Sequence, residues 1–237
     1  MIKKRIFKPS DMFCPVPSVM VTCGTMENSN IITVAWTGIV NSEPPYVYIS
    51  VRKSRYSHDI IEKSGEFIIN FGTEDTCKQM DYCGVKSGRD VDKFKETGLH
   101  KMKGDKVSCP LIVESPVNLE CKVIEKHEYP SHDMFLGEIV SIHVNEDIIN
   151  EDDKIDFLRA NLVSYVHGEY MGHRKTPVGF FGYSVARPKI LKKRSKEAHD
   201  RRVLAKGTVG KHSQGKKPQE KVTTIKTSNK KSNGKKK

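Results

Sequence analysis

Short runs in which apolar and polar residues alternate occupy the first part of the chain. They cover residues 18–25, 31–40 and 46–52, are rich in β-branched residues, and are interrupted by a polar turn and by Pro44-Pro45. Alternation with a period of two predicts strands that bury one face. Because these runs are short and closely spaced, they favour an antiparallel meander or barrel over βαβ units.

Helical segments interrupt the later strands. Ser57 is predicted to be the N-cap of a short helix over residues 59–64, which ends at Gly65, and a strand follows at residues 66–71. The other predicted elements are a helix at 73–82, a loop at 83–105 with a helical piece at 91–96, strands at 117–125 and 135–144, and a short helix at 152–160. At least six strands with short helical insertions predict a mainly β fold that closes into a barrel, because closure removes exposed strand edges.

Charge is distributed unevenly along the chain. Residues 188–237 contain 18 Lys or Arg and three acids, whereas the whole chain carries +12, so residues 1–187 sum to −3. The basic segment contains few apolar side chains, and it cannot bury enough surface to offset the entropy lost on ordering. We therefore predict one globular domain over residues 1–187 and a disordered Lys-rich tail over residues 188–237.

Several classes of protein lack their sequence signals here. No dinucleotide-binding, P-loop, nucleophile-elbow or zincin motif is present, and no CxxC pair suggests a metal site or a redox pair. Apolar runs stay below the length that spans a membrane, and prolines interrupt any signal-peptide core near the N-terminus. These features predict a cytoplasmic protein with reduced thiols and no membrane segment.

A cationic segment follows the third predicted strand and leads into the first predicted helix. Arg52, Lys53 and Arg55 supply positive charge, and Ser54 and Ser57 supply hydroxyl groups. The first N–H groups of a helix attract anions, and a ring of cations strengthens that preference, so a phosphate group suits this position. The alternative is a solvated basic turn with Ser57 as an ordinary N-cap.

The single tryptophan, Trp36, lies within the second apolar run. Thr33 and Thr37 flank it, and Gly38 follows. Small and hydroxylated residues beside an aromatic side chain allow a flat ring to approach the backbone closely. The alternative is that Trp36 belongs to the core.

Several motifs in a fixed order resemble the flavin reductase and flavoredoxin family over about residues 10–187. In chain order they are Asn30–Thr37, Pro44-Pro45, Ser50–Ile61, Phe67–Asn70, the S-G-x-D-x-D-K-F segment at Ser87–Phe94, and His132–Ile139. The resemblance implies an FMN-binding split β-barrel with short helical insertions.

The resemblance also implies the residues of an FMN site. They are Thr33, Trp36, Thr37, Ser50, Val51, Arg52, Lys53, Arg55, Ser57, His58, Asn70, Phe71 and Lys93. No side chain is assigned a catalytic role, and His132 is either a contact to nicotinamide or an exposed loop histidine. The run from Tyr129 to Asp133 differs from the G-D-H pattern of classical flavin reductases, so the resemblance is weaker for the NAD(P)H contact than for FMN.

The function implied by the resemblance is electron transfer through bound FMN. The flavin would accept a hydride from NAD(P)H, or electrons from a redox protein, and pass them on. The family also implies a homodimer with the site at its interface. Three alternatives stay open: an FMN electron carrier without direct NAD(P)H activity, a barrel that has lost its cofactor, and a nucleic-acid-associated protein that uses the Lys-rich tail.

Overall fold

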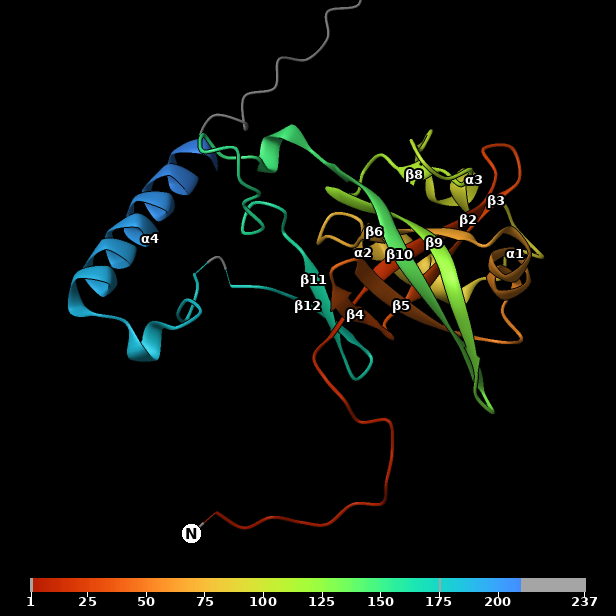
Figure 1. Cartoon of the computed structure of the whole chain (residues 1–237), viewed down its shortest axis with the longest axis horizontal. Helices are drawn as coiled ribbons and strands as arrows, with labels where there is room; N and C mark the ends of the chain where they lie inside the picture. The colour runs from red at the N-terminus through yellow and green to blue at the C-terminus, as the bar shows by residue number, and fades with distance from the viewer. Residues whose placement is uncertain (1, 175, 210–237) are drawn as a thin grey trace, which may run out of the picture. The chain divides into compact units, whose positions relative to one another are not determined.

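This computed structural model describes residues 2–174 and 176–209 (Figure 1). The chain divides into two compact units between residues 175 and 176, and each unit is described by itself. The boundary predicted from the sequence lies later in the chain, after residue 187.

A seven-stranded antiparallel sheet forms the centre of the first unit (Figure 1). Its spatial order is β3-β2-β6-β9-β10-β5-β4. In chain order the strands are β2 (Val19–Gly24), β3 (Ser29–Val34), β4 (Thr37–Ser42), β5 (Pro45–Arg52), β6 (Glu66–Phe71), β9 (Val117–Glu128) and β10 (His132–Val144). The mainly β fold predicted from alternation is confirmed.

The sheet curls because its two edge strands are neighbours in the sequence. β3 lies at one edge and β4 at the other, yet only Ala35 and Trp36 separate them along the chain. The backbone N–H of Ser50 on β5 donates to the carbonyl of Trp36 at 2.9 Å and ties this bend to the far side of the sheet. The prediction of one strand over residues 31–40 is wrong, because a straight strand cannot lie at both edges.

The barrel interior is filled by apolar side chains that reach inward from both halves of the sheet. Phe67 and Phe135 are among the largest fully buried side chains. β10 shifts its register against β9 between Leu136 and Gly137. A Cβ atom at Gly137 would lie 2.8 Å from the ring of Phe67, so the glycine leaves room for that ring.

Three short helices accompany the barrel: α1 (Tyr56–Ser64), α2 (Cys77–Val85) and α3 (Lys93–Thr97). Ser57 is not the N-cap of α1. Arg55 holds that position without a side-chain capping bond, while Ser57 is buried and accepts a hydrogen bond from Asn30 at 2.7 Å. Gly65 ends α1 with a φ of 67°, as predicted.

The second helix begins later than the sequence suggests. The backbone N–H groups of Thr73 and Thr76 each donate to the other residue's hydroxyl, at 3.0 and 3.2 Å. This reciprocal turn satisfies the backbone locally, so α2 runs from Cys77 to Val85 instead of over residues 73–82.

Smaller elements complete the first unit. They are β1 (Val16–Pro17), β7 (Lys101–Met102), β8 (Leu111–Ile112), the 3-10 turn η1 (Glu146–Ile148), β11 (Val163–Val166) and β12 (Glu169–Gly172). β11 and β12 form a hairpin through His167 and Gly168, which have φ values of 45° and 96°. Positive φ at both turn residues matches the twist of the flanking strands.

The helix predicted over residues 152–160 is absent from this described part of the chain. The Asn150 side-chain oxygen accepts hydrogen bonds from the backbone of Asp152 and Lys154, both at 3.0 Å. Asp153 has a φ of 57°. Local side-chain bonds of this kind compete with a helix, and the segment folds as successive turns.

The second unit contains the 3-10 turn η2 (Tyr183–Val185) and helix α4 (Pro188–Val209). Helix α4 covers residues 188–209 of the predicted tail, whose disorder stays a prediction. Pro188 suits a first helical position, Lys, Arg, Ala and Leu favour helix, and Arg194 pairs with Glu197 at 3.5 Å. Residues 210–237 of the predicted tail lie outside the described residues. Within the described ranges, no helix is long and apolar enough to cross a membrane.

Asn70 connects three elements beneath the barrel wall. Its side chain is fully buried, donates to the carbonyl of Met20 at 3.0 Å, and accepts from the backbone of Ile112 at 3.0 Å and from Asn118 at 2.8 Å. Removing one member of a buried hydrogen-bond network leaves the remaining polar groups with neither a protein partner nor water, and this lowers the free energy of unfolding.

We expect Asn70→Ala to lower the free energy of unfolding by about 3 kcal/mol, because several buried groups lose their partner. Urea unfolding at neutral pH measures this. The matched control is Asn41→Ala, which removes an exposed turn bond to Pro44 and should change stability by about 0.5 kcal/mol or less. Equal losses in the two variants would contradict the structural role given to Asn70.

Candidate functional site

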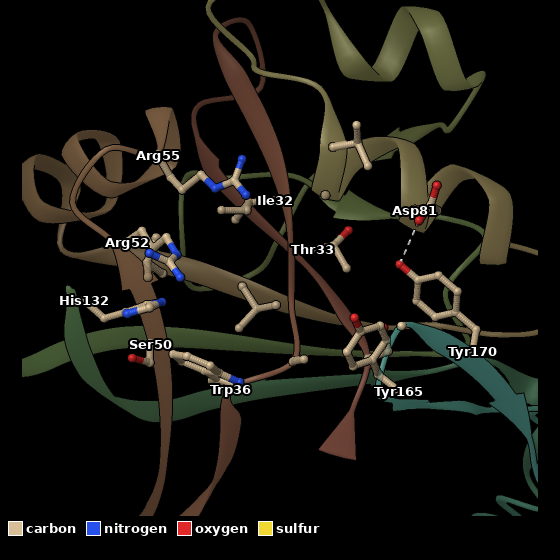
Figure 2. Close-up of a pocket in the computed structure, with 17 residues that line it drawn as sticks. Ile32, Thr33, Trp36, Ser50, Arg52, Arg55, Asp81, His132, Tyr165 and Tyr170 are labelled. Atoms are coloured by element: carbon tan, nitrogen blue, oxygen red, sulfur yellow. Dashed lines mark hydrogen bonds between the residues drawn. The ribbon is translucent and has the colours of Figure 1, made fainter. Parts of the chain in front are cut away.

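A cleft of about 370 Å³ lies at the seam of the barrel, where the two sheet edges approach each other (Figure 2). One wall comes from β3 and the bend after it, from Ile32 to Trp36. The facing wall comes from the end of β5, Ser50 to Arg52. Gly84 of α2 and the β11–β12 hairpin complete the lining.

A second hollow of about 250 Å³ continues the cleft toward the start of α1. We call the two hollows the first and second chambers. They share Ile32, Arg52, Arg55 and Gly84, so together they make one elongated site. A Cβ atom at Gly84 would lie 3.2 Å from the Cβ of Thr33, so the glycine lets α2 pack closely against β3 at the junction between the chambers.

Positive charge without a protein partner gathers at this junction. Among the residues that the structure describes, neither Arg52 nor Arg55 forms an ion pair or a side-chain hydrogen bond, although both line the two chambers. Lys53, in contrast, pairs with Asp133 at 3.2 Å. The residues lining the second chamber include no acid. Such guanidinium groups are ready to bind an anion, and a phosphate matches their planar donors best.

Lys93 borders the second chamber from beneath. Its ammonium is buried and donates to the carbonyls of Ile31 and Cys83, both at 2.7 Å. Burial lowers the pKa of Lys93. An ammonium has three donors, so two fasten β3 to α2 and one is left for a group in the chamber.

Trp36 and His132 form an aromatic wall in the first chamber (Figure 2). Their ring centroids lie 4.4 Å apart, and the Trp36 side chain is 38% exposed. Burial, assisted by the nearby Arg52 guanidinium, lowers the pKa of His132. His132 is therefore neutral at pH 7, with Nδ1 bonded to the Ser131 hydroxyl at 2.9 Å.

The hairpin wall was not foreseen from the sequence. Tyr165 and Tyr170 face each other across β11 and β12 at a centroid distance of 5.6 Å, and Tyr170 donates to Asp81 at 3.2 Å (Figure 2). Burial and the Asp81 carboxylate raise the pKa of Tyr170. The sequence signal for this hairpin is the dipeptide His167-Gly168, in which glycine lies between two short runs rich in strand-forming residues.

Nine of the predicted site residues line the two chambers. They are Thr33, Trp36, Ser50, Val51, Arg52, Arg55, Ser57, Lys93 and His132. Contact between these residues and a flavin stays a prediction.

The structure does not bring five other predicted residues into either chamber: Thr37, Lys53, His58, Asn70 and Phe71. Thr37 is buried and donates to the carbonyl of Tyr48 at 2.6 Å. Thr37 and Phe71 border a separate apolar hollow of about 440 Å³. His58 is buried against Asp133.

A model of the flavin reductase-like domain matches residues 12–172. The chain belongs to this family. The flavin reductase-like domain here is 28% identical to the flavoredoxin of Desulfovibrio vulgaris (Miyazaki F), with a TM-score of 0.71 over 77% of this chain and 100% of that one. It is 27% identical to the flavoredoxin from Methanosarcina acetivorans, with a TM-score of 0.68 over 78% and 100% of the two chains. The predicted split β-barrel and the family resemblance are confirmed.

The chain is also similar to a curated relative of unknown function. An uncharacterized protein of Archaeoglobus fulgidus is 30% identical to this flavin reductase-like domain over 155 residues, which is 65% of this chain and 86% of the relative. Nitrilotriacetate monooxygenase component B from Bacillus cereus has a TM-score of 0.64 at 18% identity, covering 73% of this chain and 96% of that one, and this likeness shows the shared fold alone.

Asp133 holds the start of α1 in the flavin reductase-like domain. Its side chain is 2% exposed, and it bonds His58 Nε2 at 2.8 Å and Lys53 Nζ at 3.2 Å. Burial alone would raise the pKa of this carboxyl group, but the bonds from His58 and Lys53 outweigh burial, and the pKa lies below its ordinary value of 3.8.

A depressed carboxyl pKa predicts a defined pH dependence. The stabilisation by Asp133 is complete above the unfolded-state pKa of 3.8 and is lost as the pH falls through the lower, folded-state pKa. We expect Asp133→Asn to be less stable than the wild type at pH 7 and to lose less stability between about pH 5 and about pH 3. Urea unfolding across this range is the measurement, with the exposed Asp105→Asn as control. If the unfolding free energy of Asp133→Asn changed with pH in parallel with that of the wild type, the lowered pKa of Asp133 would be refuted.

Proposed function

We propose that the chain binds FMN along the two chambers and is a flavin-dependent oxidoreductase that transfers electrons from NAD(P)H or from a redox partner. The observation that carries the proposal is the pair of guanidinium groups, Arg52 and Arg55, that have no partner among the described residues at the chamber junction. An elongated cleft with aromatic residues at one end and unpaired cations at the other fits a flat ring joined to a phosphate.

The second chamber would hold the phosphate. Arg52 and Arg55 supply paired donors, and Lys93 supplies its remaining N–H. The first turn of α1 has no side-chain cap, and its first two residues, Tyr56 and Ser57, line this chamber, so their backbone N–H groups would be available to a phosphate. No acid lines this chamber to oppose the charge of a phosphate.

The first chamber would hold the ring. Bound flavin supplies the chemistry of hydride and electron transfer. Trp36 and Ser50 orient the ring from the two sides of the seam, and the β11–β12 hairpin limits the access of water. The neutral His132 offers a ring nitrogen without adding charge beside the flavin.

A second candidate is an FMN electron carrier that does not react directly with NAD(P)H. The similarity to two flavoredoxins, at 28% and 27% identity, supports it.

We expect the purified protein to show visible flavin bands after incubation with FMN and gel filtration, and we expect anaerobic NADH to bleach them. Bands that persist with NADH or NADPH but bleach with dithionite would select the carrier. Protein that retains no flavin after incubation would overturn the proposed function and favour a barrel that has lost its cofactor.

The homodimer and the cytoplasmic location belong to the same proposal. Strand β4 exposes Ile39 and Val40 at a sheet edge, and the apolar hollow lies beside Ile39, which supports burial against a second copy. All six cysteines are free, which fits a reducing compartment. The nucleic-acid alternative depends on the tail, of which residues 210–237 lie outside the described residues.

We expect Arg55→Ala to weaken FMN binding about 10- to 100-fold, because hydrogen bonds to charged groups contribute about 1.5–3 kcal/mol. Riboflavin, which lacks the phosphate, should bind the wild type and the variant alike. Titration of each flavin by fluorescence quenching measures both affinities, with the exposed Lys63→Ala on the same helix as control. An equal loss for FMN and riboflavin would show that Arg55 does not contact the phosphate.

A further inference from the structure

The segment between α2 and α3 lies over the second chamber. We call residues 86–90 the strap. Lys86, Ser87 and Gly88 line the chamber. A turn shapes the strap, because the backbone of Asp90 donates to the carbonyl of Ser87 at 3.2 Å and that of Arg89 donates to the Ser87 hydroxyl at 3.2 Å. The strap is therefore a defined turn that forms part of the chamber wall.

Arg89 does not line either chamber. Its side chain reaches across to the segment on the other side of the second chamber, which contains the cationic loop and the start of α1. One guanidinium nitrogen donates to the carbonyl of Ser54 at 3.1 Å, and the other lies 3.7 Å from Asp59. The guanidinium carbon lies 5.3 Å from the centre of the Tyr56 ring. All three contacts fall on the cationic loop and the first turn of α1, so Arg89 joins the strap to the predicted phosphate-binding segment.

Gly88 allows the strap to pack closely against β3. A Cβ atom there would lie 2.1 Å from the side-chain oxygen of Asn30 and 2.9 Å from the Tyr56 ring, so no larger residue fits without displacing them. Asn30 in turn donates to the Ser57 hydroxyl at 2.7 Å. The strap thus rests on the same residues that border the second chamber.

We propose that Arg89 is a positioning residue that latches the strap over the second chamber and slows the release of a phosphate-bearing ligand. The proposal rests on the proposed function, because the ligand is FMN. Arg89 stands at a position that the S-G-x-D-x-D-K-F motif leaves open, so the latch belongs to this chain's own sequence. Opening the strap breaks the bond to Ser54, the ion pair with Asp59 and the stacking on Tyr56 together.

Arg89→Ala and Arg89→Lys test the latch. FMN release is followed by rapid dilution and flavin fluorescence, with riboflavin as the matched ligand without a phosphate. We expect release of FMN to accelerate on the order of tenfold in Arg89→Ala and less in Arg89→Lys, because lysine keeps the charge but not the planar donors. Riboflavin release should not change.

The matched control is Arg159→Ala. Arg159 is 51% exposed, close to the 48% of Arg89, and it also has a single acidic partner, Asp156, at 3.5 Å. It should release FMN at the rate of the wild type. Equal FMN release from Arg89→Ala and the wild type would overturn the latch, as would equal acceleration of FMN and riboflavin release.

A measurement without ligand separates failure of the latch from failure of the proposed function. Hydrogen exchange of the amides at residues 87–91 should be faster in Arg89→Ala than in the wild type and in Arg159→Ala, with equal urea midpoints in all three. Wild-type protein that retains no FMN rejects the proposed function, and strap exchange then decides whether Arg89 holds the strap. Unchanged exchange overturns the latch whether or not FMN binds.

Discussion

The structure depends on a chain crossing of two residues. Ala35 and Trp36 carry the backbone from one edge of the sheet to the other, and the Ser50–Trp36 hydrogen bond fixes the crossing. A crossing this short requires the sheet to curl, because its two edges have to come within reach of two residues. The seam, the cleft and the exposure of Trp36 all follow from this constraint. Arg52 lies at the seam because it ends β5, the strand whose Ser50 is bonded to the crossing.

The cationic side chains around the seam fall into two groups, those that pair with an acidic residue and those that do not. Lys53 and Lys126 lie near buried Asp133 and stabilise the barrel end, whereas Arg52 and Arg55 stay without partners among the described residues. A carboxylate beside a cation offsets its positive charge, so a paired lysine attracts an anionic ligand less than an unpaired arginine does. Unpaired cations carry a cost in mutual repulsion that an anion relieves. The same short stretch of sequence therefore contributes to stability and, under the proposed function, to anion binding.

Most strands of the large sheet and the cationic segment at residues 52–55 could be predicted from the sequence, because alternation and charge are local properties. Prediction failed where a residue's role depends on a distant partner. Ser57 looked like an N-cap, yet it accepts a bond from Asn30 on another strand. Trp36 and Thr37 were assigned to the same site, although neighbouring residues in extended backbone point to opposite faces. The wall made by Tyr165 could be predicted only from the hairpin turn, because β11 and β12 have four residues each and show little alternation of their own.

Strand β4 has a consequence for behaviour at high concentration. It lies at the edge of the sheet, and its outward residues Ile39 and Val40 are 65% and 55% exposed, so its backbone could template an added strand. The prolines at positions 44 and 45 end that opportunity after a few residues, because proline offers no N–H to a growing ladder. A short apolar edge closed by prolines limits the number of residues over which another strand can pair with it, and this disfavours fibrous growth.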